Sequence, residues 1–221
     1  ALALVAGITI IGTIVGIICG YVGGWIDSLL MRISDIFLAF PEMVFAIAIA
    51  GVLNGGIWSA AIAVGLIAWP RYARVARSQV LSMKNHQYMN AAKLTGTPWY
   101  KMIVKHIMPN IMGPIIVTAA LDIGAMIMNL AGLSYLGLGV VPPTPEWGSM
   151  MSEGRSMLQT SPWIVLAPGL AIFITVVIFN LLGDTVRDIL DPKQKRRSIT
   201  SNMKKVKNIV SGDSKREKSL V

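Results

Sequence analysis

Residues 88–110 read YMNAAKLTGTPWYKMIVKHIMPN, a polar interruption in a chain of 221 residues whose flanking sequence is apolar enough for a lipid bilayer. Gly96 suits the left-handed conformation that ends a helix. Thr97 and Pro98 suit the N-cap and the first position of a second helix, which Pro109 ends because the residue before a proline disfavours helix. The stretch has no acidic residue, and its cationic or imidazole side chains are Lys93, Lys101, Lys105 and His106. It therefore predicts two short helices joined by a bend on a membrane surface.

The composition excludes an ordinary soluble domain. Hydrophobic residues make up 54% of the chain and charged residues 14%, whereas about 25% of the residues in soluble proteins are charged. The single cysteine, Cys19, lies in an apolar run, so neither a disulfide framework nor a thiolate metal site is expected. The chain starts at Ala1 without a methionine or a basic signal-peptide region, and we expect further sequence upstream of it.

The apolar sequence divides into five segments that approach or exceed the length of about 20 residues that a membrane-spanning helix needs. These segments are 1–24, 36–53, 57–73, 110–132 and 163–183. Pro41, followed by Glu42, predicts a kink in the second span, and residues 25–35 are interpreted as an interfacial turn before it. The third span is expected to end in an interfacial anchor set, Trp69, Arg71 and Tyr72. The sequence thus predicts an all-α, polytopic transmembrane helix bundle with an external loop at 134–162.

The basic residues predict the orientation of these spans. Of the 20 lysines and arginines, 19 lie in segments that share one side of the membrane in this arrangement, which are 25–35, 71–109 and the region after residue 183. Only Arg155 lies on the other side. Because positive charge marks cytoplasmic segments, we expect a cytoplasmic C-terminus, an external Ala1 and therefore a sixth span upstream. The basic tail, 193–221, is expected to be disordered.

The first span contains a glycine at every fourth position, Gly12, Gly16 and Gly20. This spacing places the three glycines on one helix face, where a neighbouring helix can approach closely. They are interpreted as a packing seam with the rest of the bundle or with a partner subunit. The alternative is that lipid simply tolerates them.

Three polar residues interrupt the apolar spans. Asp122 and Asn129, seven residues apart in the fourth span, share one helix face, and Glu42 lies near an end of the second span. Intramembrane carboxylates are costly and usually face a bundle interior or a watery path. Glu42, Asp122 and Asn129 are therefore candidates for a translocation path. The alternative is that they tie helices together through hydrogen bonds.

The spacing of Ala91 and Ala92, Gly96 and Pro109 resembles the EAA loop of ABC import permeases. In that family the motif is E-A-A, three residues, a glycine and a later L-P, and the loop docks into a groove of the cytoplasmic ATPase. Asn90 stands in place of the glutamate and Met108 in place of the leucine, so a salt bridge from this glutamate is not expected here. The resemblance implies an ATPase-coupling role for Asn90, Ala91, Ala92, Gly96, Thr97, Pro98 and Pro109.

Other stretches extend the resemblance to the second permease subunit of dipeptide, oligopeptide and nickel importers. They are AWPRYARVARSQVL (68–81), LSYLGLGVVPPTPEWGSMMSEGR (133–155) and FNLLGDTVRDILDP (179–192). The resemblance implies a type I ABC importer permease domain over 1–192 in the bacterial inner membrane. It implies, as partners, a second permease subunit, two cytoplasmic ATPases that hold ATP and Mg, and an external substrate-binding protein. That binding protein is expected to contact Trp147, Glu153 and Arg155.

The residues themselves predict no catalytic chemistry. The sequence lacks the GxxxxGKS phosphate loop, and His86 and His106 lie away from the intramembrane carboxylates. We expect no enzyme activity, no bound metal or cofactor, and no nucleic-acid partner. The resemblance implies an ATP-driven importer of peptides or of nickel or other metal chelates, and residues 121–139 favour the chelate members. Two other classes stay open, an ion-gradient-driven transporter that uses Asp122 and Glu42, and a non-transporting membrane scaffold.

Overall fold

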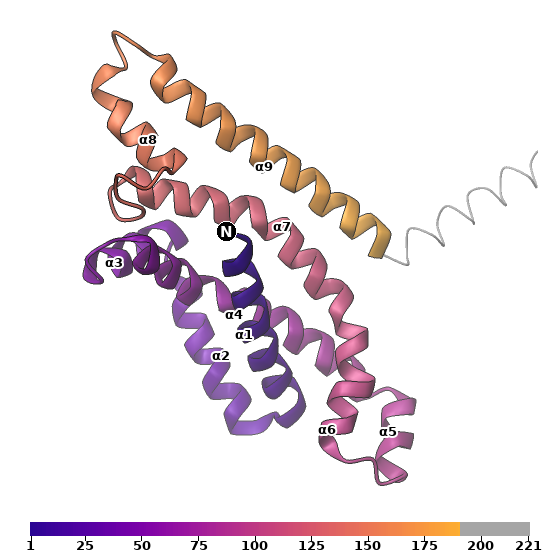
Figure 1. Cartoon of the computed structure of the whole chain (residues 1–221). Helices are drawn as coiled ribbons and strands as arrows, with labels where there is room; N and C mark the ends of the chain where they lie inside the picture. The colour runs from indigo at the N-terminus through magenta and orange to yellow at the C-terminus, as the bar shows by residue number, and fades with distance from the viewer. Residues whose placement is uncertain (191–221) are drawn as a thin grey trace, which may run out of the picture.

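The computed structural model describes residues 1–190, and this part of the chain consists of helices and turns without a strand (Figure 1). The predicted all-α class is therefore confirmed, whereas the tail predicted to be disordered, 193–221, lies outside the described residues. In chain order the elements are α1 (Leu2–Val22), α2 (Gly24–Ala39), α3 (Glu42–Val52), α4 (Ile57–Lys84), α5 (Gln87–Leu94), α6 (Trp99–Lys101), the π-helical turn η1 (Met102–Ile107), α7 (Met108–Tyr135), α8 (Trp147–Glu153), the 3-10 turn η2 (Gly154–Met157) and α9 (Trp163–Leu190).

Helix α1 packs lengthwise against α4, and the glycines of α1 lie at this contact. A Cβ atom on Gly12 would come within 2.6 Å of a side chain of α4, and one on Gly20 within 2.7 Å of the Val80 Cβ. A Cβ atom on Gly16 would collide with the backbone of Ala73. The missing side chains let the two backbones approach, which is how small residues hold helices together in a membrane. The predicted packing seam is confirmed, and its partner is α4 of the same chain.

The second predicted span is broken rather than kinked. Helix α2 ends at Ala39, α3 begins at Glu42, and the two helices are bent by 95°. Phe40 is extended, with φ −96° and ψ 147°, because the residue before Pro41 avoids the helical conformation, and the proline offers no N–H to continue the helix. Residues 25–35, predicted as an interfacial turn, are part of α2. The break places Glu42 in the first turn of a new helix.

The helix that contains the third predicted span, 57–73, extends beyond it, because α4 continues to Lys84. Pro70 is accommodated within the helix, and Ala73 and Ala76 beyond it are fully buried. Burial of these small side chains against α1 keeps the basic part of α4 helical. The sequence predicts a basic loop from Arg71 onward, whereas the chain stays helical to Lys84.

The number of apolar spans is smaller than predicted within residues 1–190. The helices long and apolar enough to cross a membrane are α1, the continuous helical segment Trp99–Tyr135 and α9, and the bent pair α2–α3 would add a fourth. Helix α4 is not among them because its C-terminal half is charged, with Arg71, Arg74, Arg77 and Lys84.

The helix that follows Gly96 does not end at Pro109, contrary to the prediction. Elements α6, η1 and α7 continue as one helical segment from Trp99 to Tyr135. Pro109 occupies the second position of α7, directly after the π-helical turn. Such a turn is a place where a helix tolerates an interrupted hydrogen-bond ladder. The polar stretch is therefore joined without a break to the apolar helix after it.

The helices pack around two separate buried cores, and α8 and α9 pack against α7. Helix α9 packs along α7, and α8 contacts both of them at the end opposite α5 and α6 (Figure 1). One buried core joins α1, α3, α4 and α7 and includes Ala63 and Met126. A second core lies beneath α5 and η1 and includes Ile17, Val80 and Met89. The polar stretch is thus anchored on this second core, to which α1, α4 and α7 also contribute.

Candidate functional site

Four polar side chains meet between α3, α4 and α7. Arg71 donates from Nη1 to Asp122 Oδ1 at 2.6 Å and from Nη2 to Glu42 Oε2 at 3.3 Å. Asn129 donates from Nδ2 to the other Glu42 oxygen, Oε1, at 2.9 Å. The three residues predicted for a translocation path therefore lie together, linked by an arginine. We refer to Glu42, Arg71, Asp122 and Asn129 as the polar cluster.

The polar cluster is partly buried and unevenly satisfied. The Asp122 side chain is 10% exposed, whereas Arg71 and Glu42 are 41% and 36% exposed. Asp122 Oδ2 is buried and makes no well-aligned hydrogen bond within the described residues, although the buried Tyr72 hydroxyl lies beside the Asp122 carboxylate. Two carboxylates share one guanidinium, so the cluster holds one negative charge in excess. Since lipid does not accommodate such charges, their exposed side faces protein or a watery path.

Arg71 is the member of the polar cluster that the sequence did not predict to lie there. It was predicted to be an interfacial anchor together with Tyr72, but Tyr72 is fully buried and Arg71 pairs with residues of two other helices. A signal was available, because two intramembrane carboxylates call for a cation. Arg71 is the first basic residue of the third predicted span, 57–73. The need to balance the charge of Glu42 and Asp122 would have identified it as their partner.

The other two arginines of α4 form ordinary pairs outside its apolar segment. Arg77 donates from Nε and Nη2 to both oxygens of Asp27, at 2.5 and 2.6 Å. These hydrogen bonds raise the pKa of the Arg77 guanidinium above its ordinary value. Arg74 donates to Asp35 at 2.5 Å, and both side chains are about half exposed. Both pairs tie α2 to α4, and each matches one cation with one carboxylate.

The surface formed by α5 and α6 is a second candidate site. Its inner side is anchored, because Met89 and Met102 are buried against the bundle, and Tyr21 donates from its hydroxyl to the Met102 sulfur at 3.8 Å. Its outer side exposes large apolar side chains between Lys93, Lys101 and Lys105. We refer to this surface as the α5–α6 surface; its exposed apolar residues are Tyr88, Leu94, Trp99, Tyr100 and Val104.

The bend between α5 and α6 has the predicted centre but not the predicted cap. Gly96 has a φ of +75°, and no atom lies within 4 Å of a Cβ built on it, so the left-handed backbone alone requires glycine. Helix α6 begins at Trp99, one residue later than predicted, and Thr97 makes no capping hydrogen bond to it. The Thr97 hydroxyl instead lies 3.3 Å from the Thr95 hydroxyl, which donates to the Ala92 carbonyl. Pro98 is extended, and the chain leaves the bend without a side-chain cap.

The residues predicted to contact a binding protein lie at the opposite end of the molecule. Trp147 and Glu153 belong to α8, Arg155 belongs to η2, and all three are exposed. Glu146 caps α8 by accepting a hydrogen bond from the Ser149 N–H at 2.9 Å. These residues do not join the polar cluster, and they form a separate exposed surface.

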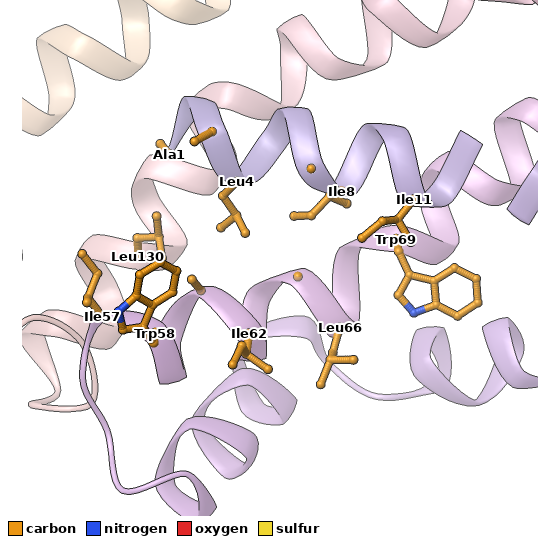
Figure 2. Close-up of a pocket in the computed structure, with 14 residues that line it drawn as sticks. Ala1, Leu4, Ile8, Ile11, Ile57, Trp58, Ile62, Leu66, Trp69 and Leu130 are labelled. Atoms are coloured by element: carbon orange, nitrogen blue, oxygen red, sulfur yellow. The ribbon is translucent and has the colours of Figure 1, made fainter. Parts of the chain in front are cut away.

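Two further features of the described residues were considered as sites, a metal-binding cluster and an apolar groove. Residues 1–190 contain no group of three His, Cys, Asp or Glu side chains that could hold a metal ion. A groove of about 590 Å³ runs between the first halves of α1 and α4, with Trp58 and Trp69 near its two ends (Figure 2). Its lining is apolar, for example Leu4, Ile8 and Ile62. The groove has no charged side chain in its lining, and its side-chain donors are the indole N–H groups of Trp58 and Trp69.

Comparison with known proteins gives one family and a set of close relatives. The family model described as binding-protein-dependent transport system inner membrane component matches residues 12–196. The dipeptide transport system permease protein DppC of Alkalihalophilus pseudofirmus is 46% identical over 191 residues, which are 86% of this chain and 63% of that protein. The glutathione transport system permease protein GsiD of Escherichia coli is 45% identical over 185 residues, 84% of this chain and 61% of that protein. This chain therefore spans about three fifths of the length of these relatives.

Proposed function

We propose, from the fact that this chain belongs to the family of binding-protein-dependent transport system inner membrane components, that it is a membrane-spanning permease subunit of an ATP-driven importer. The family has the type I ABC permease fold, and its members named above are permeases rather than enzymes. ATP and Mg would be held by partner ATPases. An ion-gradient-driven transporter and a membrane scaffold, the two other classes considered, do not fit this family.

The observation that carries the proposal is the exposed, basic and apolar α5–α6 surface. Leu94 is 89% exposed and Trp99 is 65% exposed, although both belong to a compact bend that is anchored from beneath by Met89. Large apolar side chains held outward on an ordered surface mark a protein contact. The neighbouring lysines, including Lys93 and Lys101, favour a partner groove with an acidic rim. We assign this surface to the ATPase.

The connections of the α5–α6 surface provide a route to the membrane interior. Helix α4 runs from the bend before α5 back to Arg71, and the continuous segment that begins at Trp99 runs to Asp122. At about 1.5 Å per residue, these paths are roughly 20 and 35 Å long. The two helices that leave the α5–α6 surface thus meet again at the Arg71–Asp122 ion pair. Motion of a docked ATPase would act on the polar cluster through both helices.

The substrate that we propose is a peptide. The relatives named above carry dipeptides and glutathione according to their names. This departs from the preference for nickel or other chelates that residues 121–139 favoured. The partners would be a second permease subunit, two ATPases and an external binding protein that contacts the surface of Trp147, Glu153 and Arg155. We place the chain in a bacterial cytoplasmic membrane with the α5–α6 surface inside.

Substitutions in the bend test this proposal. Ala92→Asp would bury an unpaired charge at the docked surface and weaken it by about 3 kcal/mol or more. We expect normal amounts of the chain in the membrane, loss of ATPase co-purification and loss of peptide uptake. Ala92→Ser is the matched control, since serine is small and uncharged. This variant should retain both ATPase co-purification and peptide uptake. Wild-type uptake with normally bound ATPases in the Ala92→Asp variant would contradict the coupling role.

A pair of glycine substitutions tests the geometry of the bend separately from its chemistry. A Cβ atom on either Gly96 or Gly113 would have no other atom within 4 Å, but only Gly96 has a positive φ. Gly96→Val would strain the left-handed backbone and re-aim α6, so uptake should fall severely. Gly113→Val should be tolerated. Equal uptake by the two variants would show that the bend angle does not matter for coupling.

A further inference from the structure

The polar cluster has a composition that points to a ligand. Its exposed charges belong to Glu42 and Arg71, and exposed charges within a membrane bundle face a watery path or protein rather than lipid. One Asp122 oxygen, Oδ2, is buried and forms no well-aligned hydrogen bond among the described residues, and the buried Tyr72 hydroxyl lies beside this carboxylate. A purely structural tie would be expected to match its charges and fill its acceptors. In this cluster two carboxylates share one guanidinium, so its charges are not matched.

The cluster can exchange partners without leaving a charge unpaired. Arg71 is close to Asp122, at 2.6 Å, and farther from Glu42, at 3.3 Å. If a cationic group bound the exposed Glu42 carboxylate, the guanidinium would be released to bind both oxygens of Asp122, including the unpartnered Oδ2. Two-point pairing of this kind is the geometry that arginine and carboxylate prefer. The result is two neutral pairs in place of one cation shared by two anions.

We infer that the polar cluster recognises the α-ammonium group of a peptide, with Glu42 as its acceptor and the Arg71–Asp122 pair as the adjustable counter-charge. Asn129 holds the second Glu42 oxygen through its 2.9 Å hydrogen bond and so restricts the orientation of the carboxylate. The inference rests on the proposed function, because it specifies the peptide end that this permease binds during passage.

The chemistry of the cluster selects an ammonium over other cations and over anions. A carboxylate accepts an ammonium N–H directly, and water or the peptide can satisfy the other donors. A calcium ion would need six or more oxygen ligands, and residues 1–190 contain no cluster of three metal-ligating side chains. An anionic group would meet the excess negative charge of the two carboxylates. A free amino terminus is the cationic group that every unmodified peptide carries.

The test compares two forms of one neutral-side-chain dipeptide, with a free and with an N-acetylated amino terminus, in the complete reconstituted importer. The ratio of their uptake efficiencies is measured for wild type, Glu42→Gln and Asp35→Asn. The same binding protein serves all three, so its own preference is common to them and a changed ratio reports the permease. Asp35→Asn is the matched control because it removes the carboxylate that pairs with Arg74, an arginine on the same helix, α4, as Arg71.

We expect Glu42→Gln to lower the free-to-acetylated ratio by about tenfold, the loss of one charge-assisted hydrogen bond. Asp35→Asn should leave the ratio unchanged. A variant that merely assembles poorly lowers uptake of both peptides equally, so the ratio remains readable. If Glu42→Gln does not assemble, Asp122→Asn provides the second arm, because it removes the carboxylate to which Arg71 must move and should lower the same ratio.

Two results would overturn the inference, and only the second would also refute the proposed function. A wild-type ratio in Glu42→Gln or in its substitute Asp122→Asn, with ATPases bound and peptide taken up, refutes ammonium recognition and leaves the proposed function intact. Failure of the wild-type complex to bind ATPases or to take up either peptide refutes the proposed function and the inference together.

Discussion

Arg77 and Arg71 lie six residues apart on α4, and they differ in the number of carboxylates with which they pair. Arg77 is held by both oxygens of one carboxylate, Asp27, whose side chain is 13% exposed. Arg71 is divided between two carboxylates on different helices, at unequal distances of 2.6 and 3.3 Å. The first arrangement is charge-balanced, and the second holds an excess anion and an unpartnered oxygen.

This difference separates a structural ion pair from a site that can change partners. Matched, bidentate pairing leaves no favourable alternative for either ion, so Arg77 fixes α2 against α4 in one position. Because Arg71 is shared between two carboxylates, it has a second arrangement when a cation binds Glu42. In that arrangement Arg71 pairs with Asp122 alone, and each carboxylate has one cation. Arg74, which pairs with Asp35 in an exposed position, is the weak member of the series and serves as a reference for both.

The largest effect is expected from breaking the balanced pair. Asp27→Ala would leave the Arg77 guanidinium, which is two-thirds buried, without its carboxylate, and loss of one partner of a desolvated pair costs about 3 kcal/mol. We expect a clear drop in the amount of folded chain in the membrane and in the melting temperature of the purified complex. The charge-swapped double variant, Asp27→Arg with Arg77→Asp, should recover part of the loss. Normal amounts of the single variant would show that the pair does not stabilise the fold.

A smaller effect on folding, but a clear effect on transport, is expected at the unbalanced cluster. Asp122→Asn keeps an oxygen that can accept from Arg71 and removes the excess charge, so the complex should assemble in near-normal amounts. Because Arg71 then lacks a carboxylate to which it can move, peptide uptake should fall severalfold. Uptake and amount are measured in the same membranes. A fall in amount alone would make Asp122 a helix tie, and no change in either would remove it from the site.

The smallest effect is expected at the exposed pair. Asp35→Asn removes a contact between two half-exposed side chains, and surface ion pairs of this type contribute about 1 kcal/mol or less. Amount, melting temperature and uptake should all lie close to wild type. A loss as large as that of Asp27→Ala would mean that exposure does not distinguish the pairs of α4, and the comparison would fail.

Features that depend on composition and on neighbouring residues could be predicted from the amino-acid sequence. The apolar content predicted a helical membrane protein, and the fourfold spacing of Gly12, Gly16 and Gly20 predicted a close helix contact. The left-handed bend was predicted at Gly96, because backbone preference is a property of one residue and its neighbours. Glu42 and Asp122 stood out because a carboxylate is costly in an apolar span wherever its partner lies.

Which of these residues meet, and how far each helix extends, depends on contacts between distant parts of the chain. Arg71 is 29 residues from Glu42 and 51 from Asp122 in the chain, and no local pattern selects a partner over such distances. The break at Pro41 and the continuation through Pro109 also depend on tertiary contacts. A proline raises the cost of a helix at its own position, but packing of the surrounding helices decides whether the chain turns there by 95° or continues through a widened turn.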